Sequence, residues 1–127
     1  MNKPFLVDSD VFIDYLKGLD FACDLIETHI NKICLSVVTV AEVRAGIRGK
    51  EEEEALSQFL SAIHLYDVTR TIAEMGGDWV RQFGRSHSVE IPDALIAATA
   101  AIHHLELKTL NIKHYPMIKD LAPAYQK

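Results

Sequence analysis

Short apolar runs alternate with longer segments of helical periodicity along the whole chain, and this alternation restricts the possible folds more than any other feature. The short runs predict four strands, at residues 4–7, 33–37, 64–68 and 107–110. The segments between them predict helices at residues 9–17, 21–30, 39–48, 51–63, 69–85 and 92–104. Alternating strands and helices indicate an α/β domain, with a short parallel sheet that helices cover on both faces.

The last predicted helix is apolar almost all round between residues 94 and 102, so it belongs in a core. Pro92 suits its first helical position. A chain of 127 residues with 49% hydrophobic content can bury about two-thirds of the surface that its unfolded form exposes. No repeat, low-complexity tract or Pro/Gly-rich linker divides the sequence. We therefore expect a single domain over residues 1–127.

The sequence carries no signal for a membrane or for secretion. No apolar run approaches the roughly 20 residues of a membrane span. Asp8 interrupts the N-terminal apolar stretch too early for a signal peptide. Cys23 and Cys34 have neither a metal-ligand nor a CxxC spacing, so both are expected to be ordinary reduced thiols. These features predict a cytoplasmic protein.

Three acidic residues stand where acids are least expected. Asp8 ends the first apolar run, Glu42 follows the apolar residues 35–41, and Asp93 opens the apolar helix. An ionised carboxylate at the edge of a core is costly unless it is paired, hydrogen-bonded or bound to a metal. Ligands of parallel α/β sheets bind beyond the carboxyl ends of the strands. The three acids, together with Asn111 just past the last strand, therefore predict one convergent cation site.

Each acid also has a purely structural interpretation. The pattern Thr39-x-x-Glu42 matches a capping box. Asp93 suits the positive end of a helix dipole. Asp10 either caps a helix or adds negative charge to the site. These interpretations require several coincidences at one edge of the sheet and leave Asp8, at a strand end, unexplained.

Smaller roles are open for other polar residues. Ser9 and Thr39 are candidates to orient the ligands through their hydroxyl groups, with helix capping as an equal alternative. Arg44 is a candidate to contact phosphate, with a solvated surface arginine as an equal alternative. Tyr15 and Tyr115 are candidates to stack on bases if the substrate is a nucleic acid.

Four blocks of the sequence resemble the signature blocks of PIN-domain ribonucleases, in the family's order and at family-like spacing. They are FLVDSDVFID at residues 5–14, SVVTVAEV at 36–43, IPDALIA at 91–97 and TLNIKHY at 109–115. Within the family, the blocks are most similar to those of VapC-type toxins of bacterial and archaeal toxin–antitoxin pairs. The resemblance implies a three-layer α/β/α sandwich, divalent-metal-dependent cleavage of RNA, a VapB-type antitoxin as partner and a homodimer.

The resemblance also implies roles for individual residues. Asp8, Glu42 and Asp93 match the family's catalytic acids, which hold Mg²⁺ or Mn²⁺ through carboxylate oxygens. The family's fourth acidic position falls on Asn111, where many relatives have Asp and others have Asn. The neutral amide removes one negative charge, so a second metal is expected to bind less firmly than the first.

The charge balance agrees with this chemistry. The chain has 18 acidic and 13 basic residues and a net charge of −5. That balance argues against RNA binding over a broad basic surface. Divalent cations held by carboxylates reverse the local charge and allow a phosphodiester to approach. An acidic chain is also a natural partner for a basic peptide, as an antitoxin segment would be.

Two other functions fit part of the sequence. A haloacid-dehalogenase-like phosphatase would use Asp8 as nucleophile and Asp10 as acid/base, and would leave Glu42 without a role. A receiver-type signalling domain, which is not an enzyme, would use Asp67 at the end of a central strand as phosphoacceptor. Such a domain needs a lysine after the last strand, whereas this strand leads to Thr109 and Asn111.

Overall fold

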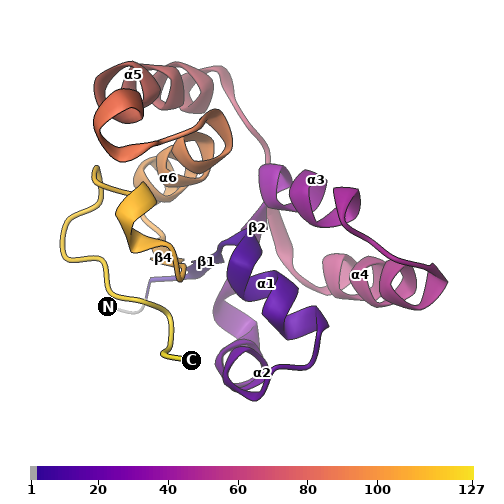
Figure 1. The fold of residues 1–127 in the computed structure, drawn as a ribbon. Coiled ribbons are helices and arrows are strands. Elements are labelled where there is room, and N and C mark those ends of the chain that lie inside the picture. Colours follow the sequence, from indigo (N-terminus) through magenta and orange to yellow (C-terminus); the bar gives the residue numbers. More distant parts are fainter. Residues whose placement is uncertain (1–2) are drawn as a thin grey trace.

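A parallel four-stranded sheet lies at the centre of the molecule, with helices on both of its faces (Figure 1). The computed structural model describes residues 3–127. The strand order is β3-β2-β1-β4, and every neighbouring pair is parallel. The strands are β1 (Phe5–Val7), β2 (Ile33–Ser36), β3 (His64–Tyr66) and β4 (Glu106–Lys108). The predicted three-layer α/β/α sandwich is confirmed.

Each segment with helical periodicity forms a helix, with small differences at the ends. The α-helices are α1 (Ser9–Leu16), α2 (Asp20–Thr28), α3 (Val37–Ala45), α4 (Lys50–Ala62), α5 (Arg70–His87) and α6 (Ile91–His103). Two short 3₁₀ turns, η1 (Ile30–Lys32) and η2 (Ile112–His114), precede β2 and follow β4.

Successive residues of the strands face opposite layers, because side chains alternate along a strand. Phe5 and Val7 of β1 belong to a core that they share with buried residues of α1, α2, α3 and α4. Leu6, between them, belongs to a second core that includes Ile96 and Ala97 of α6. Figure 1 shows α5 and α6 on one side of the sheet and α1, α2 and α4 on the other. Strand β1 is thus buried on both faces.

Helix α1 begins directly at the end of β1. The carboxylate of Asp8 caps the helix, with its Oδ1 atom accepting a hydrogen bond from the Ser9 N–H at 2.8 Å. The prediction that Ser9 or Asp10 would be the cap was wrong by one or two residues. The strand leads straight into the helix, because the cap residue Asp8 is the only residue between Val7 of β1 and Ser9 of α1.

Helix α3 begins earlier than predicted. The Ser36 Oγ atom accepts a hydrogen bond from the Val38 N–H at 3.0 Å, so the helix starts at Val37 and not at Thr39. The interpretation of Thr39-x-x-Glu42 as a capping box was therefore wrong, because Thr39 already lies inside the helix. The side chain of Glu42 is left available for another partner.

The strand β4 is shifted towards the N-terminus relative to the predicted 107–110. It pairs with β1 through Glu106 to Lys108, in register with Phe5–Val7. The next two residues leave the ladder because their polar groups bond to acidic side chains described below. Pro92 occupies the second helical position of α6, after Ile91, and not the first.

Among the helices in residues 3–127, none is long and apolar enough to cross a membrane.

Candidate active site

The three predicted acids lie at the carboxyl-end edge of the sheet. Asp8 directly follows β1, Glu42 lies on α3 after β2, and Asp93 lies in the first turn of α6. Asp8 is one of the charges that act on Asp10, on Glu42 and on Asp93, so each of these three carboxylates lies within electrostatic range of Asp8. Three segments far apart in the sequence therefore contribute to one acidic cluster.

Asp8 is the most buried of these acids, with 6% of its surface exposed. Besides capping α1 through Oδ1, it accepts two hydroxyl hydrogen bonds on Oδ2. The Thr109 Oγ1 atom donates at 2.8 Å and the Tyr115 hydroxyl at 2.7 Å. These donors replace the water that a buried carboxylate loses, so the charge can be tolerated at this depth.

Asp10 links the start of α1 to the segment that follows β4. Its Oδ2 atom accepts the Leu110 N–H at 2.9 Å, and its Oδ1 atom accepts the Val11 N–H at 2.7 Å. Burial raises the pKa of Asp10 and the neighbouring Asp8 carboxylate raises it further, while the backbone hydrogen bonds oppose the increase. Asp10 thus adds a fourth carboxylate to the cluster and also holds the segment after β4 in place.

Glu42 bonds across the site to α1. Its Oε1 atom accepts a hydrogen bond from the Ser9 hydroxyl, so these two predicted site residues are in direct contact. Partial burial raises the pKa of Glu42, the Ser9 hydrogen bond opposes that increase, and Asp8 and Asp93 add to it. Ser9 orients the carboxylate of Glu42 and does not cap α1.

Asp93 lies between its own helix and the turn after β4. Its Oδ2 atom is 3.5 Å from the Glu90 backbone N–H, the geometry of a weak helix cap, and 3.5 Å from Nδ1 of His114. Burial raises the pKa of Asp93 and Asp8 raises it further, while the Glu90 N–H and His114 lower it. The capping interpretation and the site interpretation of Asp93 are therefore compatible.

In the described part of the chain, the side chains of the other predicted site residues form no hydrogen bond or ion pair with the clustered carboxylates. The backbone N–H of Asn111 donates to Thr109 Oγ1 at 3.1 Å, which brings Asn111 to the same edge, but its exposed side chain makes no hydrogen bond within residues 3–127. Arg44 is exposed and forms no ion pair within those residues. Thr39 is fully buried, and its Oγ1 atom has no hydrogen-bond partner there.

The donor atoms of the cluster fit a hard divalent cation, since Mg²⁺ and Mn²⁺ prefer carboxylate oxygens. Burial is the main cause of the raised pKa values of Glu42 and Asp93, and the repulsion from neighbouring carboxylates that adds to it is the kind that a cation relieves. Within residues 3–127, no three His, Cys, Asp or Glu side chains already lie close enough to enclose an ion. Ion binding would have to draw Glu42 and Asp93 inward from their bonds to Ser9 and Glu90.

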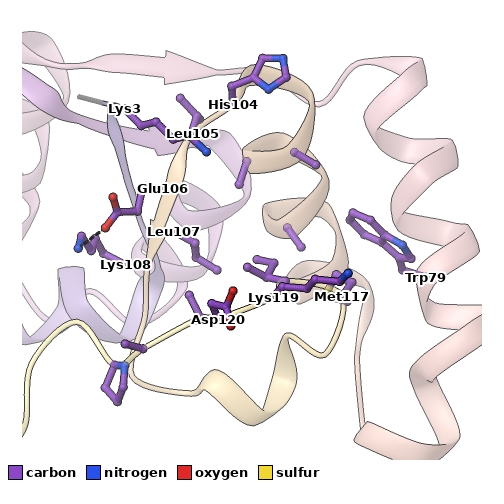
Figure 2. Close-up of a pocket in the computed structure, with 17 residues that line it drawn as sticks. Lys3, Trp79, His104, Leu105, Glu106, Leu107, Lys108, Met117, Lys119 and Asp120 are labelled. Atoms are coloured by element: carbon purple, nitrogen blue, oxygen red, sulfur yellow. Dashed lines mark ion pairs between the residues drawn. The ribbon is translucent and has the colours of Figure 1, made fainter. Parts of the chain in front are cut away.

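A cavity of about 710 Å³ lies apart from the acidic cluster, beside β4 (Figure 2). Its lining comes from β4, α6, Trp79 of α5 and residues 117–123, and it includes Lys3, Lys108 and Lys119. None of the four clustered carboxylates lines it. The four clustered carboxylates therefore lie at the acidic edge of the sheet and outside this cavity.

Two contacts of Asp8 were not predicted. In the sequence Thr109 is only a member of the last of the four blocks, and Tyr115 is a candidate for base stacking, which its 1% exposure excludes. Both residues bond to Asp8 from more than 100 positions along the chain. Their place in the block TLNIKHY, directly after the last strand, was the signal that could have suggested them.

The rival functions find no support in this arrangement. Asp67 follows β3, which is an edge strand and not a central one, so it lacks the position of a phosphoacceptor in a receiver domain. A phosphatase with Asp8 as nucleophile would give Glu42 no role, whereas Ser9 joins Glu42 to the site.

Comparison with known proteins agrees with the geometry. The sequence matches the PIN domain family over residues 5–115. It is 38% identical over 123 residues to Ribonuclease VapC10 of Mycobacterium tuberculosis, covering 94% of this chain and 92% of that protein. It is also 38% identical over 124 residues to Ribonuclease VapC19 of the same species, covering 94% of this chain and 98% of that protein.

Solved structures show the same fold. The chain superposes with a TM-score of 0.82 and 28% identity on a protein from a toxin–antitoxin complex of Klebsiella pneumoniae, covering 96% of this chain and 98% of the other. With VapBC2 of Rickettsia felis, crystallised with a promoter DNA fragment, the TM-score is 0.76 at 22% identity, covering 97% and 98% of the two chains. The second likeness concerns the fold alone.

Proposed function

The chain belongs to the PIN-domain family, among the VapC ribonucleases, and we propose that it is the endoribonuclease toxin of a toxin–antitoxin pair. One observation carries the proposal. Asp8, Glu42 and Asp93 gather at the carboxyl-end edge of the parallel sheet, in a chain 38% identical to two ribonucleases over nearly its whole length. RNA is then the substrate, and its scissile phosphate would lie against this edge.

In this proposal the acids hold Mg²⁺ or Mn²⁺. Asp8 and Asp93 are the main ligands, and Glu42 acts directly or through water. A divalent cation in such a site makes water a better nucleophile and neutralises charge that develops on the phosphate. The Ser9 hydroxyl orients Glu42, and Asn111 offers only a neutral carbonyl oxygen. Asp10 supports the site by holding the segment after β4.

We also propose that the whole of residues 1–127 acts as one catalytic domain. The C-terminal residues support this, since Ala124 and Tyr125 pack against the core shared by β1 and α1. The Ala124 N–H donates to the Thr109 carbonyl at 2.9 Å, directly beside the acidic cluster. The C-terminal segment around Ala124 is therefore attached to the same edge of the sheet as the site. Cleavage of cellular RNA by this domain would take place in the cytoplasm.

The proposed partner is a VapB-type antitoxin, with the toxin itself a homodimer. A groove of about 370 Å³ between α1, α3 and α4 supports such a partner, because its lining includes the apolar residues Ile13, Leu16, Val43 and Ile47. An amphipathic helix fits an apolar groove of this kind. A basic side chain that follows the helix would find the acidic cluster and occupy the position of the cation.

The test is to purify Asp8→Asn, Glu42→Gln and Asp93→Asn variants and to assay RNA cleavage with Mg²⁺ or Mn²⁺. Each variant should lose cleavage by about 100-fold or more while keeping its circular dichroism spectrum, because each removes a charged ligand. Asp67→Asn, which changes an exposed acid after the edge strand, is the matched control and should cleave normally. Normal cleavage by two of the three site variants would refute the assignment.

Analysis of the product ends gives a second readout from the same digest. Attack by water with departure of the 3′-oxygen leaves a 5′-phosphate and a 3′-hydroxyl, and no cyclic phosphate forms because the RNA 2′-hydroxyl takes no part. A 2′,3′-cyclic phosphate that persists in the presence of a chelator would instead indicate histidine-based acid–base catalysis, and the proposed mechanism would be wrong.

A further inference from the structure

The carboxylate of Asp8 has almost no free hydrogen-bonding capacity. An ionised carboxylate offers about four lone-pair positions on its two oxygens. The Ser9 N–H occupies one position on Oδ1, and the hydroxyls of Thr109 and Tyr115 occupy two on Oδ2, at distances of 2.7–2.8 Å. One position on Oδ1 is therefore left. Oδ2 is fully occupied by groups from the protein.

The two hydroxyls can serve Asp8 only as donors. An ionised carboxylate accepts hydrogen bonds and donates none. Thr109 Oγ1 accepts the Asn111 N–H at 3.1 Å, so its own hydrogen is directed to the carboxylate. The Tyr115 hydroxyl makes its hydrogen bond to Asp8 Oδ2 and to no other side chain within residues 3–127. Asp8 Oδ2 is thus the nearest acceptor of both hydroxyls, since Asp10 Oδ2, a second acceptor for Thr109 Oγ1, lies farther away at 3.4 Å.

Tyr115 is itself held rigidly. It is 1% exposed and belongs to the core on the α6 side of the sheet, with Leu6, Ile96 and Ala97. The residue follows η2 directly, and its N–H donates to the Ile112 carbonyl at 3.0 Å. A side chain packed this closely has few alternative rotamers, so its hydroxyl fixes the position of any group that it bonds.

We propose that Tyr115 is a positioning residue that, together with Thr109, clamps Oδ2 of Asp8 so that Oδ1 alone is presented to the cation. This inference rests on the proposed function, because it assigns Asp8 to a metal. The clamp sets the rotation of the Asp8 carboxylate before the ion arrives. Without it, the carboxylate must be ordered when the ion binds, and binding weakens. Outer contacts of this kind typically change metal affinity by about 10–100-fold.

The experiment uses Tyr115→Phe in the full chain, since phenylalanine keeps the ring in the core and removes only the hydroxyl. The matched control is Tyr125→Phe. The Tyr125 hydroxyl also donates to a carboxylate at 2.7 Å, but its acceptor, Asp14 Oδ2, is not one of the proposed metal ligands. Mn²⁺ affinity by calorimetry, metal-free melting temperature and RNA cleavage over a range of Mn²⁺ concentrations are measured for both.

We expect both variants to melt at a somewhat lower temperature, since each loses a hydrogen bond to a carboxylate. Only Tyr115→Phe should bind Mn²⁺ more weakly, by about 10-fold or more, and its cleavage rate should recover as Mn²⁺ is raised. Tyr125→Phe should keep the wild-type affinity. Thr109→Ser, which retains the donor, should bind Mn²⁺ better than Thr109→Val.

Two failures can be told apart. If the wild type binds Mn²⁺ and cleaves RNA, and Tyr115→Phe does both with unchanged affinity, the clamp is refuted and the proposed function stands. Equal weakening of Mn²⁺ binding in Tyr115→Phe and Tyr125→Phe would also refute the clamp. If the wild type itself neither binds Mn²⁺ nor cleaves RNA, the proposed function fails and the clamp fails with it.

Discussion

The carboxylates of the acidic cluster are held by different combinations of hydroxyl and backbone N–H donors. Asp8 is bonded by two hydroxyls and a backbone N–H, Asp10 by backbone N–H groups, and Glu42 by the Ser9 hydroxyl. Hydrogen bonds of this kind stabilise the charged form of each acid. Burial and mutual repulsion act in the opposite direction, and for Asp10, Glu42 and Asp93 they prevail, since the pKa of each is raised.

This imbalance predicts how stability depends on pH without metal. A carboxyl whose pKa is raised by folding keeps its proton longer in the folded protein than in the unfolded chain. Once the pH exceeds the ordinary value, 3.8 for Asp93, the unfolded chain ionises first and the folded state loses stability. The loss is absent at lower pH and complete above the raised pKa of the folded protein.

We therefore expect that, in a chelator, the melting temperature of Asp93→Asn falls less than that of the wild type as the pH rises from about 4 to about 7. The asparagine oxygen can still accept the Glu90 N–H, so the helix cap remains. Asp67→Asn, a control outside the cluster, should follow the wild type. Parallel melting curves for Asp93→Asn and wild type at every pH would contradict the prediction. Mn²⁺ should remove most of the difference by stabilising the wild type.

At the scale of elements, the close approach of α5 to α6 places the helix that carries Asp93. The paired glycines of α5 differ in what surrounds them. A Cβ atom added at Gly76 would lie 2.9 Å from Leu95 Cδ2 and 3.4 Å from the Ala94 backbone, both on α6, whereas one added at Gly77 would meet nothing within 4 Å. Gly76 is therefore packed closely against α6, whereas Gly77 faces open space.

The pair gives a matched test. Gly77→Ala should stabilise the protein by about 0.5–1 kcal/mol, because glycine in the interior of a helix is less stable than alanine by about that amount. Gly76→Ala should not give this stabilisation, because the added methyl group contacts α6. Larger side chains at this position should destabilise the protein by about 1–3 kcal/mol. Urea unfolding of both alanine variants measures the difference. An equal gain at the two positions would show that α5 can move away from α6 at no cost.

At the scale of the whole molecule, the acidic cluster and the groove between α1, α3 and α4 lie on connected elements. Helix α1 starts at the Asp8 cap and contributes Ile13 and Leu16 to the groove, and α3 carries Glu42 and contributes Val43. A partner helix in the groove would thus be seated beside the site. The chain's net charge of −5 favours a basic segment as the part that follows.

We expect Ile47→Asp to weaken binding of the antitoxin encoded by the neighbouring gene by about 10-fold or more, because it places a charge in an apolar groove. The control is Val68→Asp, which alters another exposed apolar residue outside the groove and should bind as the wild type does. RNA cleavage by both free variants should be normal. Binding that is unaffected by Ile47→Asp, or that is indifferent to salt and Mn²⁺, would place the partner elsewhere.

The sequence alone determined the layers of the fold and the acidic residues at its edge. Strand and helix periodicities differ, so residues 5–7, 33–36 and 91–103 could be assigned to elements by local pattern alone. Parallel strands place their carboxyl ends together, so acids that follow different strands could be expected to meet. The helix ends were less certain because α1 and α3 follow their strands directly, capped by Asp8, which comes after β1, and by Ser36, the last residue of β2.

Only the tertiary structure decided which groups hold those acids. Thr109 and Tyr115 reach Asp8 across 101 and 107 positions, and Ser9 reaches Glu42 across 33. Such contacts depend on where the turn after β4 folds back and on how α6 packs against the sheet. Neither feature can be predicted from the local periodicity of the sequence. A hydroxyl directed into a core looks the same in the sequence as one directed to solvent, so the donors that control the charge of the site emerge only when distant segments are brought together.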